Sequence, residues 1–261
     1  MTSATDLRVR LQSGLGDAYR IESELSGGMS RVFVAEDLKL GRKVVIKVLP
    51  DDLAGSVNME RFEREVRLSA RLQHPHVVPL LAAGSVDGLP YYVMPFVEGE
   101  SLRARLTREG ELPIADVVRI LREVADALDY AHRRGVVHRD VKPDNILLTE
   151  RHAVVTDFGV AKALSDATGE ARITATGVAL GTPAYMAPEQ IGAEPNVDAR
   201  ADIYAAGAMA FEMLTGQPPF RGATTQAVLA AHMTREPPAL GSLRQAVPAD
   251  LSAIIRRCLE K

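Results

Sequence analysis

Cysteine is almost missing from this chain of 261 residues, since Cys258 is the single one. An intrachain disulfide is therefore excluded, and a reducing compartment is the expected environment. No apolar run approaches the roughly 18 residues of a membrane helix, and the N-terminus lacks the apolar core of a signal peptide. The formal net charge is only -3, so the chain as a whole offers no electrostatic attraction for nucleic acid or an anionic membrane.

The rest of the composition is typical of a globular protein. Apolar residues make up 46% of the chain and charged residues 25%. A chain of this length can form one large domain, or two lobes, around a buried core. No internal repeat or low-complexity segment is visible.

The stretch His138–Asn145, with the sequence His-Arg-Asp-Val-Lys-Pro-Asp-Asn, concentrates residues that can do chemistry. Two short apolar runs follow it, at residues 146–148 and 153–155, and then comes Asp157-Phe158-Gly159. If these runs form a hairpin, Asp140, Asn145 and Asp157 are held near one point. Carboxylate and amide oxygens suit a hard cation such as Mg²⁺, which also binds phosphates.

Within this stretch, Lys142 adds a positive charge where a phosphoryl group would pass, and Asp140 is the carboxylate best placed to accept a hydroxyl proton. A polar turn before a hairpin would explain any one of these residues. It does not explain the whole string at this spacing.

The N-terminal part predicts a short helix followed by strands. Leu7, Leu11 and Leu15 are four residues apart, which favours an amphipathic packing or lid helix over residues 5–15. Strands rich in Val, Ile and aromatic residues are expected after it, and glycines in the first turn allow backbone N–H groups to approach phosphates. The predicted elements are strands at 19–25, 31–36, 43–49, 77–83 and 91–97, with a helix at 57–73.

The C-terminal part predicts helices, among them a long core helix over residues 114–134. A long loop runs from Asp157 to Glu189, and such length inside a compact domain is often functional. The other predicted helices are a short one starting at Leu102 and three at 198–215, 223–234 and 248–260.

The motifs occur together and in a fixed order. Val44-Val45-Ile46-Lys47 ends a strand, the stretch His138–Asn145 and Asp157-Phe158-Gly159 follow, and Ala187-Pro188-Glu189 closes the long loop. In these motifs the chain resembles the bacterial eukaryotic-like serine/threonine protein kinases, from about residue 19 to its end. The resemblance implies an α+β, bilobal protein-kinase fold: a small antiparallel β lobe with one main helix, and a larger, mostly helical lobe. The implied domains are a helical extension at 1–18, the small lobe at 19–97 and the large lobe at 98–261.

The resemblance also implies the catalytic roles. Lys47, held by Glu65, grips the α- and β-phosphates of ATP, and Asp140 orients the substrate hydroxyl and accepts its proton. Lys142 neutralises charge on the γ-phosphoryl group. Asn145 and Asp157 hold Mg²⁺, or Mn²⁺ in its place. The residues expected to contact ATP come from both lobes: Gly27, Gly28, Ser30, Val32, Lys47, Met94, Val97 and Leu147.

Further roles are implied for the long loop and its surroundings. Thr174 and Thr176 are the expected phosphoacceptors, with Arg139 as a partner for the phosphate. Thr182 belongs to the substrate-binding end of the loop, and together with Lys142 it favours serine and threonine over tyrosine as acceptors. Asp202 is expected to be buried and to hydrogen-bond the backbone of the His-Arg-Asp loop.

Two features depart from the kinase pattern. The glycine loop is one residue short, because Leu25 or a gap falls where the first glycine belongs, and this predicts weaker closure over ATP. The chain also stops at Lys261, before the Asp-Pro turn and the arginine that pairs with the glutamate of Ala-Pro-Glu, so a C-terminally truncated domain is expected. Loss of that partner from a half-buried Glu189 is destabilising.

These departures keep a second function open: a kinase-fold binding module with weak or no turnover. The intact Lys47, Asp140, Asn145 and Asp157 count against it. A small-molecule kinase of the aminoglycoside type is a further alternative, but those enzymes usually carry His-Gly-Asp and lack the Ala-Pro-Glu segment.

The expected partners are ATP and protein substrates that bear serine or threonine, with self-association for trans-phosphorylation. Nucleic acid is not expected as a partner, and the chain contains no predicted membrane segment. The expected location is the cytoplasm, or the cytoplasmic face of the membrane if the full-length protein has a membrane helix beyond residue 261.

Overall fold

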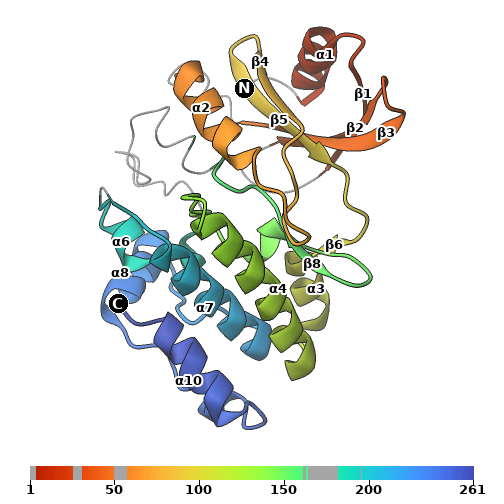
Figure 1. Cartoon of the computed structure of the whole chain (residues 1–261). Coiled ribbons are helices and arrows are strands. Elements are labelled where there is room, and N and C mark those ends of the chain that lie inside the picture. Colours follow the sequence, from red (N-terminus) through yellow and green to blue (C-terminus); the bar gives the residue numbers. More distant parts are fainter. Residues whose placement is uncertain (1–3, 26–30, 50–57, 161–162, 164–181, 195) are drawn as a thin grey trace.

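The structure is a computed structural model, and it describes residues 4–25, 31–49, 58–160, 163, 182–194 and 196–261. A twisted sheet with two helices forms the N-terminal part, and helices dominate the C-terminal part below it (Figure 1). The chain passes between them after β5. This is the two-lobed arrangement expected from the sequence.

The N-terminal lobe is built on a five-stranded sheet with the order β1-β2-β3-β5-β4, in which all neighbouring strands are antiparallel. Successive side chains of its middle strand, β3, are buried on opposite faces of the sheet, because side chains along a strand alternate between the two faces. The strands are β1 Tyr19–Leu25, β2 Arg31–Asp37, β3 Arg42–Val48, β4 Ala82–Val86 and β5 Leu89–Pro95.

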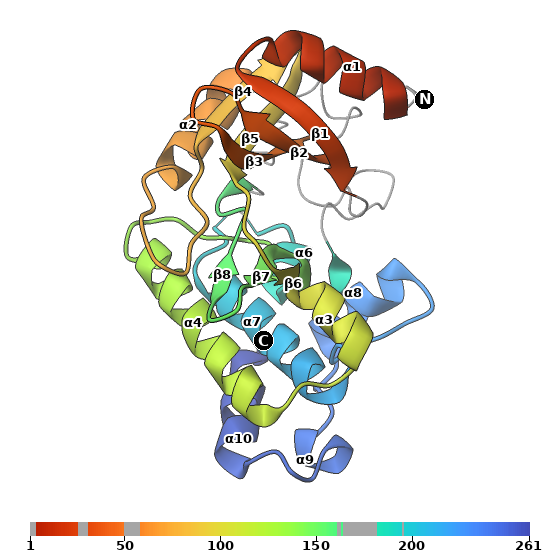
Figure 2. The ribbon, with the colours of Figure 1, turned by 90° about the vertical axis from the view of Figure 1, so that its right-hand side faces the viewer.

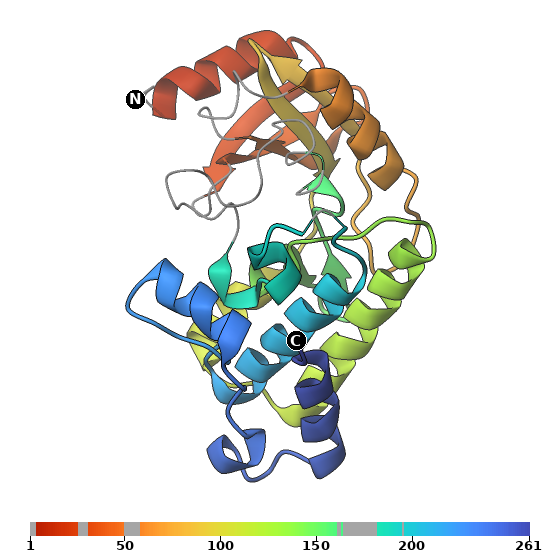
Figure 3. The same cartoon turned by 90° about the vertical axis from the view of Figure 1, so that its left-hand side faces the viewer.

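Two helices cover different faces of this sheet. The leucines of α1 (Ala4–Leu15) pack with Val44, Ile46 and Val48 of β3. The apolar side of α2 (Met59–Ser69), represented by Phe62, packs with Val45 on the other face. The two helices accordingly lie on different sides of the strands in two opposite views of the molecule (Figures 2 and 3). The predicted N-terminal packing helix is confirmed.

The predicted strand at residues 77–83 is wrong. The strand in this region, β4, begins at Ala82, and α2 ends at Ser69 rather than at 73. Residues 70–81 instead descend to the C-terminal lobe (Figure 2). There Val77 forms a parallel bridge with Val155, and Val78 N donates to Val155 O at 2.9 Å. Val77 and Val78, which suggested a strand, are instead buried where this segment packs against β8.

The C-terminal lobe is organised around α4 and α7. Helix α7 is buried over nearly its whole length and contacts α4, α10 and the segment around Tyr185. A small three-stranded sheet, β6-β7-β8, lies at the top of this lobe. The elements are β6 Glu100–Ser101, α3 Leu102–Glu109, α4 Ile114–His132, β7 Ile146–Leu148, β8 Ala153–Val155, α6 Pro188–Ile191, α7 Arg200–Thr215, α8 Thr225–Thr234, α9 Leu240–Leu243 and α10 Ala249–Cys258, with single 3₁₀ turns at Pro143–Asn145 and Pro183–Tyr185.

The lobe junction requires a glycine. Gly99 lies between β5 and β6 with a φ of 145°, and a Cβ atom there would lie 2.1 Å from the backbone oxygen of Leu148.

Among the described residues, no helix has both the length and the hydropathy that crossing a bilayer requires.

Candidate active site

The residues around Asp140 form a connected group. Lys142 Nζ lies 2.8 Å from Asp140 Oδ2. Asn145 Nδ2 donates to the same Oδ2 at 3.0 Å and to the backbone oxygen of Asp140 at 2.8 Å. The amide nitrogen of Asn145 is thus used within the loop, which leaves its Oδ1 as the atom available to a cation.

The hairpin predicted after this stretch is confirmed and joins it to Asp157. Ile146 pairs with Val155 across β7 and β8, and Thr156 N donates to the backbone oxygen of Asn145 at 3.0 Å. Asn145 and Asp157 therefore leave the same end of one hairpin.

Asp157 is held by residues of the other lobe. Lys47 Nζ lies 2.7 Å from Asp157 Oδ2, and the hydroxyl of Tyr92 donates to Oδ1 at 2.6 Å. Burial by itself raises the pKa of Asp157, but the charge and hydrogen bond of Lys47 and the hydrogen bond from Tyr92 outweigh it, so the pKa of Asp157 is lowered. Asp157 is therefore an anion at neutral pH although it is buried.

The strand pattern explains why these two donors meet. Lys47 lies on the same face of β3 as Val45, and its register partner across the sheet is Tyr92 of β5. Side chains of directly paired residues stand side by side on one face. Burial, followed by the charge of Asp157, raises the pKa of Tyr92 well above its ordinary value, so its hydroxyl stays protonated and donates.

His138 connects its own loop to the segment that carries Asp157. Its Nε2 lies 2.8 Å from the backbone oxygen of Thr156, and its Nδ1 accepts from Asp140 N at 3.2 Å. A carbonyl can only accept, so Nε2 carries the proton. The ring also packs edge-on against Phe158, with centroids 4.7 Å apart.

Asp202 of α7 fixes the backbone of the same loop, as the sequence predicts. It accepts from His138 N at 2.8 Å and from Arg139 N at 2.7 Å, and His132 Nε2 lies 2.8 Å from its Oδ2. Arg139 has a φ of 67°, a conformation that costs energy in a non-glycine residue. The buried carboxylate of Asp202 offsets that strain.

The end of the long loop is attached to this framework. Gln190 Nε2 donates to the backbone oxygen of Arg139 at 3.0 Å, and Arg139 itself donates to Val197 O at 3.0 Å. Thr182 is half-buried just before the 3₁₀ turn at Pro183–Tyr185.

The apolar residues predicted to contact ATP lie in one cluster that joins the lobes. Met94 of β5 is buried in it, and three others are partly buried around it: Val32, Val97 and Leu147. Val32 and Met94 belong to the N-terminal lobe and Leu147 belongs to β7 of the C-terminal lobe, so both lobes contribute residues to this cluster.

The remaining predicted residues include several that lie outside the described part of the chain, namely Gly27, Gly28, Ser30, Thr174 and Thr176. Glu65 is half-buried on α2. Lys47 is paired with Asp157, so the expected pairing of Lys47 with Glu65 stays a prediction.

Tyr92 was not predicted from the sequence. Tyr92 could have been found from its position on β5, directly opposite Lys47 of β3. That position can be used only when the pairing of the two strands is already known.

The donor set fits a divalent cation. Asp157 offers an anionic carboxylate and Asn145 a carbonyl oxygen, at adjoining positions, and both side chains are more than nine-tenths buried. Oxygen donors of this kind are those that Mg²⁺ and Mn²⁺ take.

Comparison with known proteins agrees with this geometry. The family model described as "Protein kinase domain" matches residues 19–261. The chain is 38% identical over 254 residues to serine/threonine-protein kinase PknB of Mycobacterium leprae, covering 95% of this chain and 40% of that protein. It is 38% identical over 256 residues to PknB of Mycobacterium tuberculosis, with the same coverage of both chains.

The chain thus spans about 40% of the length of these curated relatives. Among solved structures, the crystal structure of Rad53 1-466 in complex with AMP-PNP matches with a TM-score of 0.75 and 26% identity, over 93% of this chain and 60% of that one. The predicted fold class and the resemblance to bacterial serine/threonine kinases are confirmed: the chain belongs to the protein kinase domain family.

Proposed function

We propose that this chain is the catalytic domain of a serine/threonine protein kinase that transfers the γ-phosphoryl group of ATP to protein hydroxyls and phosphorylates itself on its long loop. The observation that carries the proposal is the convergence of Asp140, Lys142, Asn145 and Asp157 with Lys47, which comes from the opposite lobe. The relatives, named serine/threonine-protein kinases, give no support to an inactive binding module.

The proposed mechanism assigns one role to each of these residues. Asp140 orients the acceptor hydroxyl and takes its proton, and Lys142, 2.8 Å away, neutralises charge on the transferred group. Lys47 grips the α- and β-phosphates, with Glu65 as its support. Asn145 and Asp157 would hold Mg²⁺, or Mn²⁺ in its place, and the bound ion would neutralise charge on the phosphates of ATP.

Positioning and electrostatics supply most of the catalysis in such a reaction, because the phosphoryl group passes through a loose transition state. The adenine ring is proposed to lie against Val32, Met94, Val97 and Leu147. Since ATP is the donor, we place the domain in the cytoplasm or on the cytoplasmic side of a membrane.

Intact mass after incubation with Mg-ATP tests the proposal. The wild-type chain should gain mass in steps of one phosphate, mapping to Thr174 or Thr176, and an Asp157→Asn variant should gain none. Asp129→Asn, an exposed carboxylate of α4 paired with Arg133, is the matched control and should gain phosphate as the wild type does.

Absence of mass gain in a wild-type chain that melts cooperatively would refute self-phosphorylation and favour the binding module. A rise of its melting temperature with Mg-ATP would then mark a nucleotide-binding module. For trans-phosphorylation, phosphate should appear on the Asp157→Asn chain once active chain is added, whereas an intramolecular reaction leaves that variant unmodified.

A further inference from the structure

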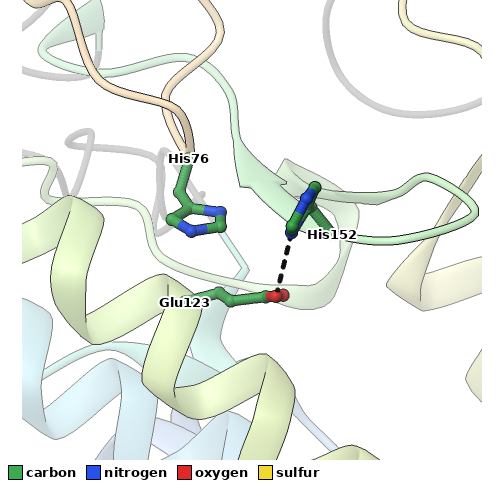
Figure 4. A group of neighbouring side chains, drawn as sticks. All are labelled: His76, Glu123 and His152. Carbon is green, nitrogen blue, oxygen red and sulfur yellow. Dashed lines mark hydrogen bonds and ion pairs between the residues drawn. The ribbon is translucent and has the colours of Figure 1, made fainter.

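Three side chains that play no part in the proposed mechanism converge behind the β7–β8 hairpin. His76 comes from the loop between α2 and β4, Glu123 from α4, and His152 from the turn before β8 (Figure 4). One ligand atom from each lies within 4.8 Å of the other two. They come from three separate segments of the chain, so their convergence is a product of the fold.

The hydrogen bonds around His76 prepare its ring for a metal. Its Nδ1 lies 2.9 Å from the backbone oxygen of Ala153, and since that oxygen can only accept, Nδ1 carries the proton. In the neutral ring, Nε2 then has a free lone pair. A metal-ligating histidine usually donates its second ring nitrogen to a carbonyl or carboxylate in this way.

Glu123 is oriented in the same manner. Its Oε2 accepts from Ala153 N at 2.7 Å and from Arg119 at 3.2 Å. This leaves Oε1, which lies 3.3 Å from His152 Nδ1. Zinc bonds of about 2.0–2.1 Å place neighbouring ligand atoms of a tetrahedron about 3.3 Å apart. The Glu123–His152 spacing therefore matches one edge of such a site.

We propose that His76, Glu123 and His152 form a binding site for Zn²⁺ or a similar borderline transition metal, with water as the fourth ligand. Two imidazoles and one carboxylate are a donor set that such metals take and that Mg²⁺ does not favour. The bound ion would join the loop at 70–81, which connects to the N-terminal lobe, to α4 and the β7–β8 hairpin of the C-terminal lobe. It would clamp the two lobes on the side of the hairpin where α4 packs.

One charge opposes this binding. The guanidinium of Arg119 lies beside Glu123 and repels a cation. An Arg119→Gln variant should therefore bind Zn²⁺ several-fold more tightly than wild type. Arg122→Gln, an exposed arginine on the same helix, is its control and should change the affinity far less.

The test is a Zn²⁺ titration of the purified, tag-free full chain against a chromophoric chelator. One Zn²⁺ per chain is expected, with affinity at least tenfold weaker in His152→Ala and in Glu123→Gln. His74→Asn is the matched histidine control, because Asn Oδ1 can replace the Nδ1 that accepts from His76 N. It should bind as wild type does. The Co²⁺-loaded chain should show tetrahedral absorption, which His152→Ala should lose.

Each other outcome overturns the site. If wild type binds no zinc, the cluster is an ion pair between His152 and Glu123. If His152→Ala binds as tightly as wild type, or if Asp157→Asn abolishes binding, the ion lies elsewhere. Circular dichroism and urea unfolding without zinc should show that every variant is folded.

Discussion

Tyr92 is a single residue on which the candidate active site depends. Its hydroxyl is fully buried and donates to Asp157 at 2.6 Å, opposite the bond from Lys47. A buried hydrogen bond to a charged group contributes about 1.5–3 kcal/mol. Removal of this donor leaves one oxygen of a buried carboxylate with the hydroxyl of Thr156, 3.5 Å away.

A Tyr92→Phe variant should therefore lose about 2 kcal/mol of unfolding free energy, measured by urea unfolding. Tyr91→Phe removes the neighbouring hydroxyl, which is part-buried and faces the other side of β5, and should lose less than about 0.5 kcal/mol. Equal losses in the two variants would show that the hydrogen bond from Tyr92 to Asp157 adds no measurable unfolding free energy.

His232 gives the protein a pH dependence at the same scale. Burial lowers the pKa of His232 to about 4, with its Nδ1 2.8 Å from the hydroxyl of Tyr204. In the unfolded chain the pKa of a histidine is about 6.5. Below that pH the unfolded state binds a proton that the folded state does not, so stability falls as the pH falls from about 6.5 to about 4.

This loss should reach up to about 3 kcal/mol. Urea unfolding at several pH values should show a flatter profile for His232→Gln than for wild type. Parallel profiles for the two proteins would contradict the assignment to His232.

At the scale of elements, α7 holds the backbone of His138 and Arg139 through Asp202. The carboxylate is fully buried and accepts from two consecutive backbone N–H groups. An asparagine there has one acceptor oxygen, and its amide group would face a donor.

Asp202→Asn should cost about 2–4 kcal/mol of unfolding free energy. Asp198→Asn, at an exposed carboxylate paired with Arg200, should cost less than about 1 kcal/mol. Urea unfolding measures both. A small cost at Asp202 would mean that the strained conformation of Arg139 is maintained by other contacts, such as that of Gln190.

At the scale of the whole molecule, Gly99 sets how closely the connection between the lobes approaches β7. A Cβ atom would lie 2.1 Å from the Leu148 backbone oxygen, which no side-chain rotation can relieve. Gly99→Ala should lower the unfolding free energy by about 2–4 kcal/mol.

Gly110→Ala is the matched control, because this glycine has a φ of 74° but nothing within 4 Å of the added methyl group. It should cost about 1 kcal/mol, from backbone strain alone. If thermal melting and urea unfolding give the two variants the same stability, the close approach of Gly99 to the Leu148 backbone does not explain why a glycine is needed at the lobe junction.

The sequence by itself determined the elements whose signal is local. The leucines four apart predicted α1, and the runs rich in Val and Ile at residues 31–36 and 43–49 predicted β2 and β3. The spacing of the motifs, with a hairpin between them, predicted that Asp140, Asn145 and Asp157 lie near one another. These patterns are readable because the period of a helix or strand is written along the chain.

Tertiary structure alone decided the rest. Val77 and Val78 have the composition of a strand, yet they are buried against β8 because the loop at 70–81 crosses to the other lobe. Tyr92 meets Asp157, and His76 meets Glu123 and His152, through strand pairing and lobe packing that join distant segments. Such contacts leave no periodic trace in the sequence, because each is set by the packing of whole elements rather than by their neighbours in the chain.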